Sequence, residues 1–501
     1  MKIKQVLIII FALIIASFIG YRIGINRTGS FTDVLESTQE HHSPPPVVIE
    51  PGSGVETASY IIFKDDEGFV YAKSGDTGEI EFSGTDAAIV INNALNALTS
   101  GRTWKETVFL KGNFSLTKTG GEQCLTIPSY TILKIDGQLI YDEVPVGKVF
   151  LISNSAHGAG NTNIDIIGGR WNGNYPDTNC AEGGIYFNNV QNFSITQTEI
   201  VNTDGTGIYL RKCSDGTIIE NTLDNLGVDT TGGAAIGLTG TNRTDVSHNR
   251  ITNSAGGIYL GAEDASGFRY CQYNRIVANH IENVNRDAIS LYPSQSVNCY
   301  VRFNVVSGNT LIDCSGDGQH AGVKVGHHVG DAHVEENDII GNVITFHMHS
   351  TTAGGIAVFP DACRNNIVGN TFHMRTDSSG IVIASGADDN IIKSNYISNA
   401  YSAIRIHGNT TLVEGNYLYQ SDKWAIQINT GGGGNNFITG NYISGVAVDN
   451  PIEIRNSGCT GNVIFGNYIY DSTAATEIND VGGWVDNNKT YNYEDEDGWV
   501  V

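Results

Sequence analysis

The sequence predicts an all-β fold, a right-handed parallel β-helix of roughly a dozen coils. Two repeated patterns support this prediction. In the first, a small residue precedes Ile or Val, an outward residue and an aliphatic residue, as in Gly207-Ile208-Tyr209-Leu210. In the second, an aliphatic strand ends in Asn. These Asn residues recur 21 to 33 residues apart, at Asn221, Asn249, Asn279, Asn309, Asn342, Asn370, Asn395, Asn416, Asn441 and Asn467.

Each repeat contains short alternating strands separated by Gly, Asn and Ser turns, with no room for a crossover helix. Strands that recur once per coil in one direction stack as parallel sheets, with their inward Ile, Val and Leu side chains aligned. We expect the repeated Asn to adopt the left-handed conformation at a tight corner, and its amide to bond to neighbouring coils. The alternative, a β-propeller, has longer blades with different sequence marks.

The first part of the chain predicts three segments. Residues 1–25 combine a basic start with an apolar run, which indicates a signal peptide or a membrane anchor. Residues 26–59 include three consecutive prolines and predict a flexible linker. Residues 60–120 predict N-terminal strands and a capping helix. We therefore expect an extracellular protein, secreted or anchored to the cell surface, whose N-terminal segment contacts the membrane.

The capping helix has an apolar face formed by Ala88, Ile91, Leu95 and Leu98, and Thr85 is its expected N-cap. After it, residues 121–475 form the parallel β-helix. Residues 476–501 are acidic and form a C-terminal cap or tail.

The charge balance of 29 basic against 53 acidic residues argues against nucleic acid as a partner. It also predicts repulsion from anionic polymers unless a local basic patch or a bound cation intervenes. The eight cysteines include no Cys-x-x-Cys pair, which argues against a zinc site. Cys271 and Cys299 lie about one coil apart, so they either form a disulfide or stay as buried thiols.

Three stretches resemble the entry into the pectate-lyase-like β-helix superfamily: Asp86-Ala87-Ala88, Val108-Phe109-Leu110 and Gly112-Asn113-Phe114. The strand Tyr60-Ile61-Ile62-Phe63-Lys64 resembles archaeal surface members of that group. The resemblance covers residues 60–470 and implies that the helix closes the end of the stack. It says little about activity, because the superfamily includes lyases, hydrolases, epimerases, phage tailspikes and surface proteins.

The first repeated pattern also predicts two outward rows along the stack, because the Ile and the aliphatic residue point inward. We expect the small residue beside the Ile to keep this face shallow. Flat rings on such a face suit the apolar faces of sugars, although Tyr ladders also stabilise sheets without a ligand. The candidate substrate-binding residues are Tyr209, Tyr259, Tyr292, Phe359, Arg286 and His407.

The coils around residues 287–361 carry the densest polar side chains and predict a catalytic groove. A lyase of a uronic-acid polymer must remove a weakly acidic proton next to a carboxylate. Chondroitinase-like and alginate-lyase-like β-helices resemble this chain in residue types, with a Lys and an Arg in such roles. The candidate catalytic residues are Lys324 as base, with Arg405, His327, His328 and Asp317. The candidate Ca²⁺ ligands are Asp264, Asp287, Asp313 and Asp317.

These residues predict an extracellular carbohydrate-active protein, a polysaccharide lyase that cleaves an acidic (uronic-acid) polysaccharide by calcium-assisted β-elimination. Its partner is then an acidic polysaccharide or a cell-surface glycan. One alternative is a non-catalytic adhesin, envelope or glycan-binding protein. The expected anchor and linker favour it, as does the absence of the pectate-lyase Asp-His and epimerase Asp-Pro-His-Asp signatures. Another is a glycoside hydrolase that uses paired Asp residues. A transition-metal site is a further option, formed by His320, His327, His328, His347 and His349.

Overall fold

The computed structural model describes residues 58–143, 148–175, 181–227, 233–263, 267–293, 298–314, 320–326, 333–347, 354–429, 433–456, 458–470, 478–480 and 489–493. The chain divides into residues 1–56 and residues 57–501, and the described residues all belong to the second unit. The predicted signal peptide or anchor therefore lies outside the described residues. Within the described part, no helix has the length and apolar character needed to cross a membrane.

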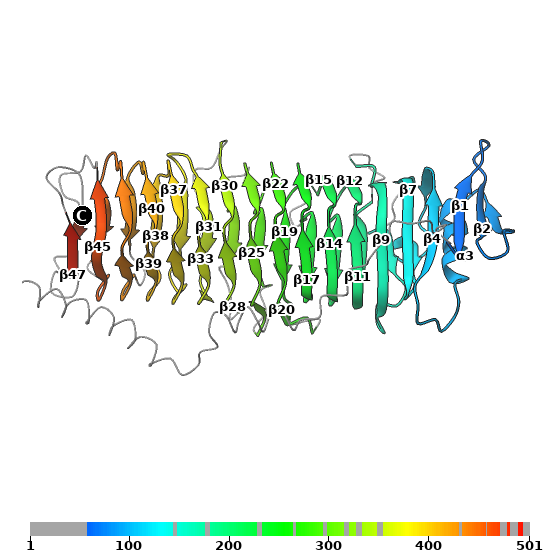
Figure 1. The fold of residues 1–501 in the computed structure, drawn as a ribbon, viewed down its shortest axis with the longest axis horizontal. Helices are drawn as coiled ribbons and strands as arrows, with labels where there is room; N and C mark the ends of the chain where they lie inside the picture. The colour runs from blue at the N-terminus through cyan, green and yellow to red at the C-terminus, as the bar shows by residue number, and fades with distance from the viewer. Residues whose placement is uncertain are drawn as a thin grey trace, which may run out of the picture. The chain divides into compact units, whose positions relative to one another are not determined.

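The described residues form a parallel β-helix, in which successive coils lie side by side along the stack (Figure 1). This all-β architecture confirms the predicted fold class. One face of the stack is a fourteen-stranded sheet, called sheet I here. Its strands are β6 (Gln123–Ile127), β8 (Phe150–Asn154), β10 (Gly183–Asn188), β13 (Ile208–Arg211), β16 (Ile236–Thr239), β19 (Ile258–Gly261), β23 (Ile289–Leu291), β27 (Val323–Val325), β31 (Gly354–Val358), β35 (Ser379–Ile383), β38 (Ser402–Ile406), β41 (Trp424–Ile428), β44 (Ile452–Ile454) and β46 (Ile478–Asp480).

The other faces belong to a 29-stranded sheet, called sheet II. It begins with β1 (Tyr60–Lys64), β2 (Val70–Ser74), β3 (Ile80–Gly84), β4 (Glu106–Lys111), β5 (Phe114–Leu116), β7 (Thr131–Tyr141) and β9 (Asn161–Asn172). Strands β1, β2 and β3 pair antiparallel, whereas the pairs that build the coils are parallel. The long strand β9 then pairs with two different strands, β11 and β12, which start two columns.

The first column contains β11 (Val190–Thr196), β14 (Ser214–Ile219), β17 (Asn242–Ser247), β21 (Arg275–Val277), β25 (Val305–Ser307), β29 (Asp338–Ile340), β33 (Asn366–Val368), β36 (Ile391–Lys393), β39 (Leu412–Glu414) and β42 (Phe437–Thr439). The second contains β12 (Glu199–Thr203), β15 (Thr222–Leu226), β18 (Arg250–Thr252), β22 (His280–Glu282), β26 (Thr310–Ile312), β30 (Val343–Thr345), β34 (Thr371–His373), β37 (Tyr396–Ser398), β40 (Tyr417–Tyr419) and β43 (Tyr442–Ser444). Both columns meet at β45 (Val463–Tyr470), which pairs with β47 (Lys489–Tyr493). A small third sheet holds β20 (Tyr270–Gln272), β24 (Tyr300–Arg302), β28 (His333–Glu335) and β32 (Ala362–Cys363).

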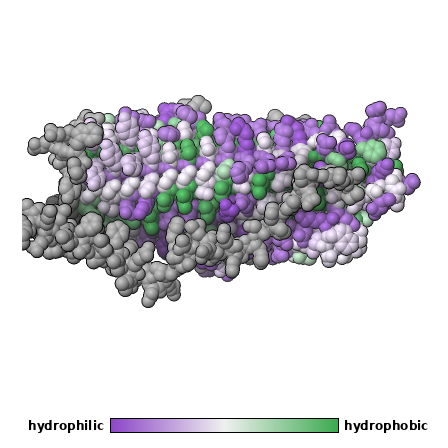
Figure 2. Space-filling view, viewed as in Figure 1, coloured by the Kyte–Doolittle hydropathy of each residue, from purple (hydrophilic) through white to green (hydrophobic). Residues whose placement is uncertain are grey.

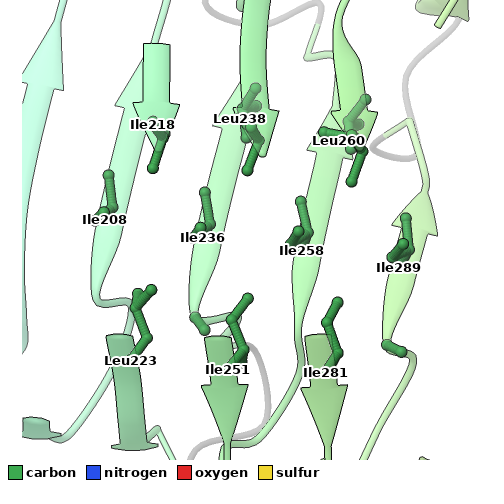
Figure 3. Packing of buried hydrophobic residues seen from close by; sticks show 14 of the residues in the cluster. Ile208, Ile218, Leu223, Ile236, Leu238, Ile251, Ile258, Leu260, Ile281 and Ile289 are labelled. Atoms are coloured by element: carbon green, nitrogen blue, oxygen red, sulfur yellow. The ribbon is translucent and has the colours of Figure 1, made fainter. Parts of the chain in front are cut away.

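The core fills the space between the sheets with aligned aliphatic side chains. Ile208, Ile236, Ile258 and Ile289 come from four successive strands of sheet I, and each is at most 1% exposed (Figure 3). Equivalent side chains therefore pack on one another from coil to coil, as the repeated pattern predicts. Such stacking removes apolar surface from water at every coil, which stabilises the fold.

The predicted Asn ladder runs through the core at the corner between the two columns of sheet II. Asn279 donates from Nδ2 to Oδ1 of Asn309 at 3.0 Å, and its backbone N–H donates to the same oxygen at 2.9 Å. The same pattern links the predicted residues from Asn221 to Asn467. The prediction that these amides bond to neighbouring coils is therefore confirmed.

The predicted left-handed conformation of these Asn residues is wrong. The residue just before each ladder Asn has the positive φ instead, as in Ala278 (φ 54°), Gly308 (φ 63°) and Ser394 (φ 54°). The corner needs one left-handed residue, after which the Asn side chain turns into the core. A second ladder, which we did not predict, lies at another corner and includes Asn274, Asn304, Asn337, Asn365, Asn390, Asn436 and Asn462.

The one described helix, α3 (Ala87–Asn96), buries Ala88, Ile91 and Leu95 against the first coils, so its predicted apolar face is confirmed. Its N-cap is Asp86 rather than the predicted Thr85. Asp86 has extended backbone angles, and its carboxylate accepts a hydrogen bond from the backbone N–H of Ile89 at 3.2 Å. That the helix closes the stack stays a prediction from the resemblance.

The small residues of the first pattern point into the core, which corrects the predicted shallow face. A Cβ built on Gly380 would lie 2.7 Å from Cγ2 of Ile397, and one on Gly355 would lie 2.6 Å from the Phe372 ring. The small residue and the following Ile therefore both face inward. The residue is small because core side chains of the facing strand occupy the space.

The described cysteines form no disulfide with one another. Cys271 and Cys299 are buried and are not joined by a disulfide, so the disulfide alternative for this pair is wrong. Burial raises the pKa of Cys271 to about 12, which keeps it in the thiol form at neutral pH.

Candidate functional site

The outward row of sheet I has the register that the sequence predicts. Tyr186 pairs with Tyr209, and the register continues coil by coil through Gly237, Tyr259, Ser290, Lys324, Ala357, Val382, Arg405, Gln427 and Glu453. These side chains share one face because strand residues two apart point to the same side. On the side of the molecule that Figure 2 shows, apolar and polar residues form bands that follow the stack.

Aromatic rings from adjacent coils contact one another along the N-terminal half of this face. The Tyr186 ring stacks on Tyr209 with centroids 5.6 Å apart and on Phe150 with centroids 4.9 Å apart. Further along, Tyr259 and Tyr292 have centroids 6.1 Å apart. Burial raises the pKa of Tyr209, so this hydroxyl stays protonated at neutral pH. The face carries stacked rings here, with the Arg211–Glu263 ion pair beside Tyr209.

Lys324 lies between two of these rings. Its Nζ is 5.0 Å from the Tyr292 ring centroid and 5.0 Å from the Phe359 ring centroid. Gly326, between them in register, has φ +95°, and a Cβ there would lie 2.9 Å from Ala362 Cβ. The backbone at Gly326 thus favours glycine, which leaves room for the Lys324 side chain between the rings. Two ring faces hold the ammonium group in place and stabilise its positive charge.

The predicted acidic ligands are only partly covered by the described residues. Asp264, Asp317, His327, His328 and His349 lie outside them. Asp287 accepts a hydrogen bond from the backbone N–H of Ala321 at 2.8 Å, and its Oδ2 lies 3.2 Å from His320 Nδ1. Asp313 accepts a hydrogen bond from the backbone N–H of His347.

Each of these carboxylates is thus tied to the next coil, and the described residues contain no group of three His, Cys, Asp or Glu side chains placed to hold a metal ion. Calcium binding stays a prediction. Arg286 and Asp287 lie close enough to Tyr292 to affect its hydroxyl. Burial and then the Asp287 charge raise the pKa of Tyr292, and the Arg286 charge opposes them. Asp287 therefore shares the region of Lys324.

Arg405 and His407 belong to a different part of the face. Lys324 is followed in register by Ala357, Val382 and then Arg405. Three strand spacings of about 4.8 Å place the two backbone positions about 14 Å apart. The structure therefore does not bring Arg405 and Lys324 together at one reaction centre.

The predicted outward rows include Arg455 and Gln427 but not Trp424 and Lys423, which also lie near Arg405. Trp424 packs edge-on against Tyr401 with centroids 5.7 Å apart, while Lys423 and Arg455 each lie 5.1 Å from the Trp424 ring centroid. Trp424 occupies the position two residues before the repeated Ile, outside the two rows that the pattern predicts. The preceding coils carry Gly354, Ser379 and Ser402 at this position. A Trp in place of a small residue was therefore the signal in the sequence that could have identified this site.

A second aromatic surface lies on the second column of sheet II. Tyr396, Tyr417 and Tyr442 are in register, and the middle ring is 58% exposed. With Leu418 and Tyr419 they line a shallow pocket of about 130 Å³. In the sequence, a Tyr directly follows the last four predicted ladder residues, Asn395, Asn416, Asn441 and Asn467. They provide a matched set of exposed rings away from Lys324.

Known proteins share the architecture of this chain. Residues 178–372 match a family model described as a right handed beta helix region. The tailspike protein of E. coli bacteriophage HK620, solved in complex with pentasaccharide, has 12% identity and a TM-score of 0.58, over 88% of this chain and 83% of that chain.

A mutant of that tailspike in complex with hexasaccharide has 11% identity and a TM-score of 0.57, over the same shares of the two chains. At these identities the likeness shows the fold alone. No curated relative matches the chain. The archaeal likeness of the first strand stays a prediction.

Proposed function

We propose that this protein binds an acidic polysaccharide along the outward face of sheet I, with Lys324 as the contact for a sugar carboxylate. The observation that carries the proposal is the position of Lys324 Nζ, 5.0 Å from the ring centroids of both Tyr292 and Phe359. The rings offer apolar surface for sugar faces and orient the ammonium group. Because the chain has a net charge of −24, it needs a fixed cation at the binding face to attract an anionic polymer.

The shape of the face also supports a polymer. Its side chains repeat at the spacing of the strands, about 4.8 Å, over many coils, so an extended chain can follow the stack. The structural neighbours, tailspikes solved in complex with oligosaccharides, support a glycan as the ligand class. We propose that the protein acts outside the cell, where such polymers occur, and that residues 1–25 export or anchor it.

Binding of polyuronides to the full chain tests this proposal. Polygalacturonate, alginate and hyaluronan are compared with neutral dextran by isothermal titration calorimetry. Lys324→Gln should weaken polyuronide binding roughly tenfold, because a charge-assisted contact is lost. Tyr417→Ala, which removes an exposed ring from sheet II, is the matched control and should bind normally. Equal binding of dextran, or unchanged binding by Lys324→Gln, would contradict the proposal.

Cleavage of the bound polymer by calcium-assisted β-elimination is the catalytic form of the same proposal. Asp287 supports it, because this carboxylate lies close enough to raise the pKa of Tyr292 beside Lys324. The test follows ultraviolet absorbance of unsaturated product with Ca²⁺ or a chelator present. We expect product from wild type with Ca²⁺ and none from Lys324→Ala. Binding without product would leave the non-catalytic form of the function.

A further inference from the structure

Sheet I carries a partly buried cation, Arg405, that the described residues do not pair. Arg405 makes no hydrogen bond or ion pair within the described part of the chain, and its Nε is buried without a partner. Burial, and next the charge of Arg455, work to lower its pKa, although nearby Tyr401 opposes this. Charged groups that are removed from water are normally paired, because the loss of hydration without a compensating partner is unfavourable.

Two neighbours of Arg405 also have unsatisfied polar atoms. Gln427, directly opposite in register, is fully buried, and its Oε1 has no hydrogen-bond partner among the described residues. Trp424 is 5% exposed, and its Nε1 likewise has none. With Ser402 Oγ, which lies opposite Trp424 in register, four polar atoms in the adjacent strands β38 and β41 lack a partner among the described residues. This is unusual, since nearly all buried polar groups in native proteins are hydrogen-bonded.

The types of these atoms define what could satisfy them. Arg405 Nε and Trp424 Nε1 are donors, whereas Gln427 Oε1 is an acceptor. Arg405 and Gln427 are opposite each other but do not bond to one another. A ligand that satisfies all three must therefore accept hydrogen bonds, donate from a hydroxyl, and carry negative charge to match the guanidinium. A sugar with a carboxylate has this combination.

The rim of the cluster supports the same ligand. Lys423 and Arg455 lie over the Trp424 ring with side chains 35% and 46% exposed, so both positive charges reach solvent. The nearest carboxylates only partly offset them: Lys423 Nζ is 4.0 Å from Asp449, and Arg455 Nε is 3.6 Å from Glu453.

We propose that Arg405, Trp424 and Gln427 form a separate subsite for one acidic sugar unit, with the carboxylate at Arg405 and a hydroxyl at Gln427. Arg405 lies three strands beyond Lys324 in register, which is about 14 Å. The inference rests on the proposed function, because the sugar unit at Arg405 belongs to the same acidic polysaccharide that contacts Lys324. An oligosaccharide that spans both cations should then bind more tightly than one that reaches a single cation.

The test uses the full chain with sodium glucuronate and a series of oligouronides of increasing length, and glucose as the neutral probe. Arg405→Gln should weaken glucuronate binding roughly tenfold or more and remove the gain from longer oligomers. Arg405→Lys should restore part of it, and Trp424→Phe should weaken binding without unfolding the protein. Lys393→Gln removes an equal charge from an exposed pair on sheet II and should change nothing.

The outcomes separate this inference from the proposed function. If Lys324→Gln weakens oligouronide binding while Arg405→Gln and Trp424→Phe bind like wild type, the subsite does not exist and the proposed function stands. If only the Arg405 variants weaken binding, the subsite stands and the proposed contact at Lys324 is wrong. If wild type binds neither glucuronate nor any oligouronide, both fail, and the three polar atoms hold ordered water.

Discussion

Asn309 donates from Nδ2 to Oδ1 of Asn342 at 2.9 Å, and the backbone N–H of Asn309 donates to the same oxygen at 3.0 Å. Asn309 also accepts the equivalent pair of bonds from Asn279. One buried side chain thus satisfies polar groups in three successive coils. Its removal has consequences beyond its own coil, because each lost bond leaves a buried group without a partner.

The first prediction concerns this ladder. Asn309→Ala should lower the free energy of unfolding by about 2–5 kcal/mol, because it leaves the Ile276 carbonyl and the Asn279 backbone N–H unsatisfied. Chemical denaturation followed by circular dichroism measures the change. Thr310→Ala, one residue along and partly exposed, is the control and should cost less than about 1 kcal/mol. Equal costs for both variants would show that the ladder contributes little.

The second prediction concerns the left-handed residue before each ladder Asn. Ala278 has φ 54° where the next coil carries Gly308 with φ 63°. Ala278→Gly should therefore raise the free energy of unfolding by about 1 kcal/mol, because it relieves left-handed strain. The same substitution at Ala288, which is buried in sheet I without positive φ, should destabilise the protein. A lower free energy of unfolding in both variants would mean that the corner imposes no strain on Ala278.

The third prediction is a dependence of stability on pH through His157. Burial lowers the pKa of His157 below its usual value, and Ser153 Oγ lies 2.6 Å from its Nε2. The folded state therefore favours neutral imidazole, and the unfolded state takes up more protons just below pH 6.5. The stability that His157 contributes is present above that pH and is lost as the pH falls through this window.

Thermal unfolding of wild type and His157→Gln from pH 7.5 to pH 5 measures this effect. The difference in Tm between the two proteins should shrink as the pH falls. A difference that stays constant, or grows, would show that His157 is not held in the neutral form.

The fourth prediction concerns the stability of the ligand-free protein. Arg405→Met should raise the free energy of unfolding by about 1 kcal/mol, because an apolar side chain of similar length removes a partly buried charge that has no partner among the described residues. Arg243→Met is the contrast. Arg243 forms two hydrogen bonds with the Asp215 carboxylate, at 2.6 and 2.7 Å, so its loss should bring no gain. Destabilisation by Arg405→Met would indicate that Arg405 is satisfied within the protein.

The coil register could be predicted from the sequence because equivalent residues recur in every coil. Tyr186, Lys324 and Glu453 fall in one row for the same reason that their neighbouring Ile residues align in the core. The ladder amides were predictable in the same way. Their backbone conformation was not, because the left-handed position holds Glu220, His248, Ala278, Ser394 or Gly and so has no constant residue in the sequence.

The candidate site was harder to predict, since it depends on exceptions to the repeat. Strict alternation places Gly380 outward, but a Cβ at this position would meet the core side chain of Ile397. Trp424 stands outside the expected rows, and its partners Lys423 and Arg455 come from separate parts of the sequence. The distance between Lys324 and Arg405 could be estimated only from the number of strands between them, which the register supplies.

The direction of the Asn ladder has a consequence for how this protein could gain or lose length. Every amide from Asn221 to Asn441 donates to the Oδ1 of the next ladder Asn, in the following coil, and also to a backbone carbonyl of the preceding coil. The spacing between successive members nevertheless varies between 21 and 33 residues. A duplicated coil that carries its own Asn at the corner could accept a hydrogen bond from the ladder Asn of the preceding coil and donate one to the ladder Asn of the following coil. Such a stack is modular, so engineered versions with extra or deleted whole turns should fold, whereas cuts through a turn should not.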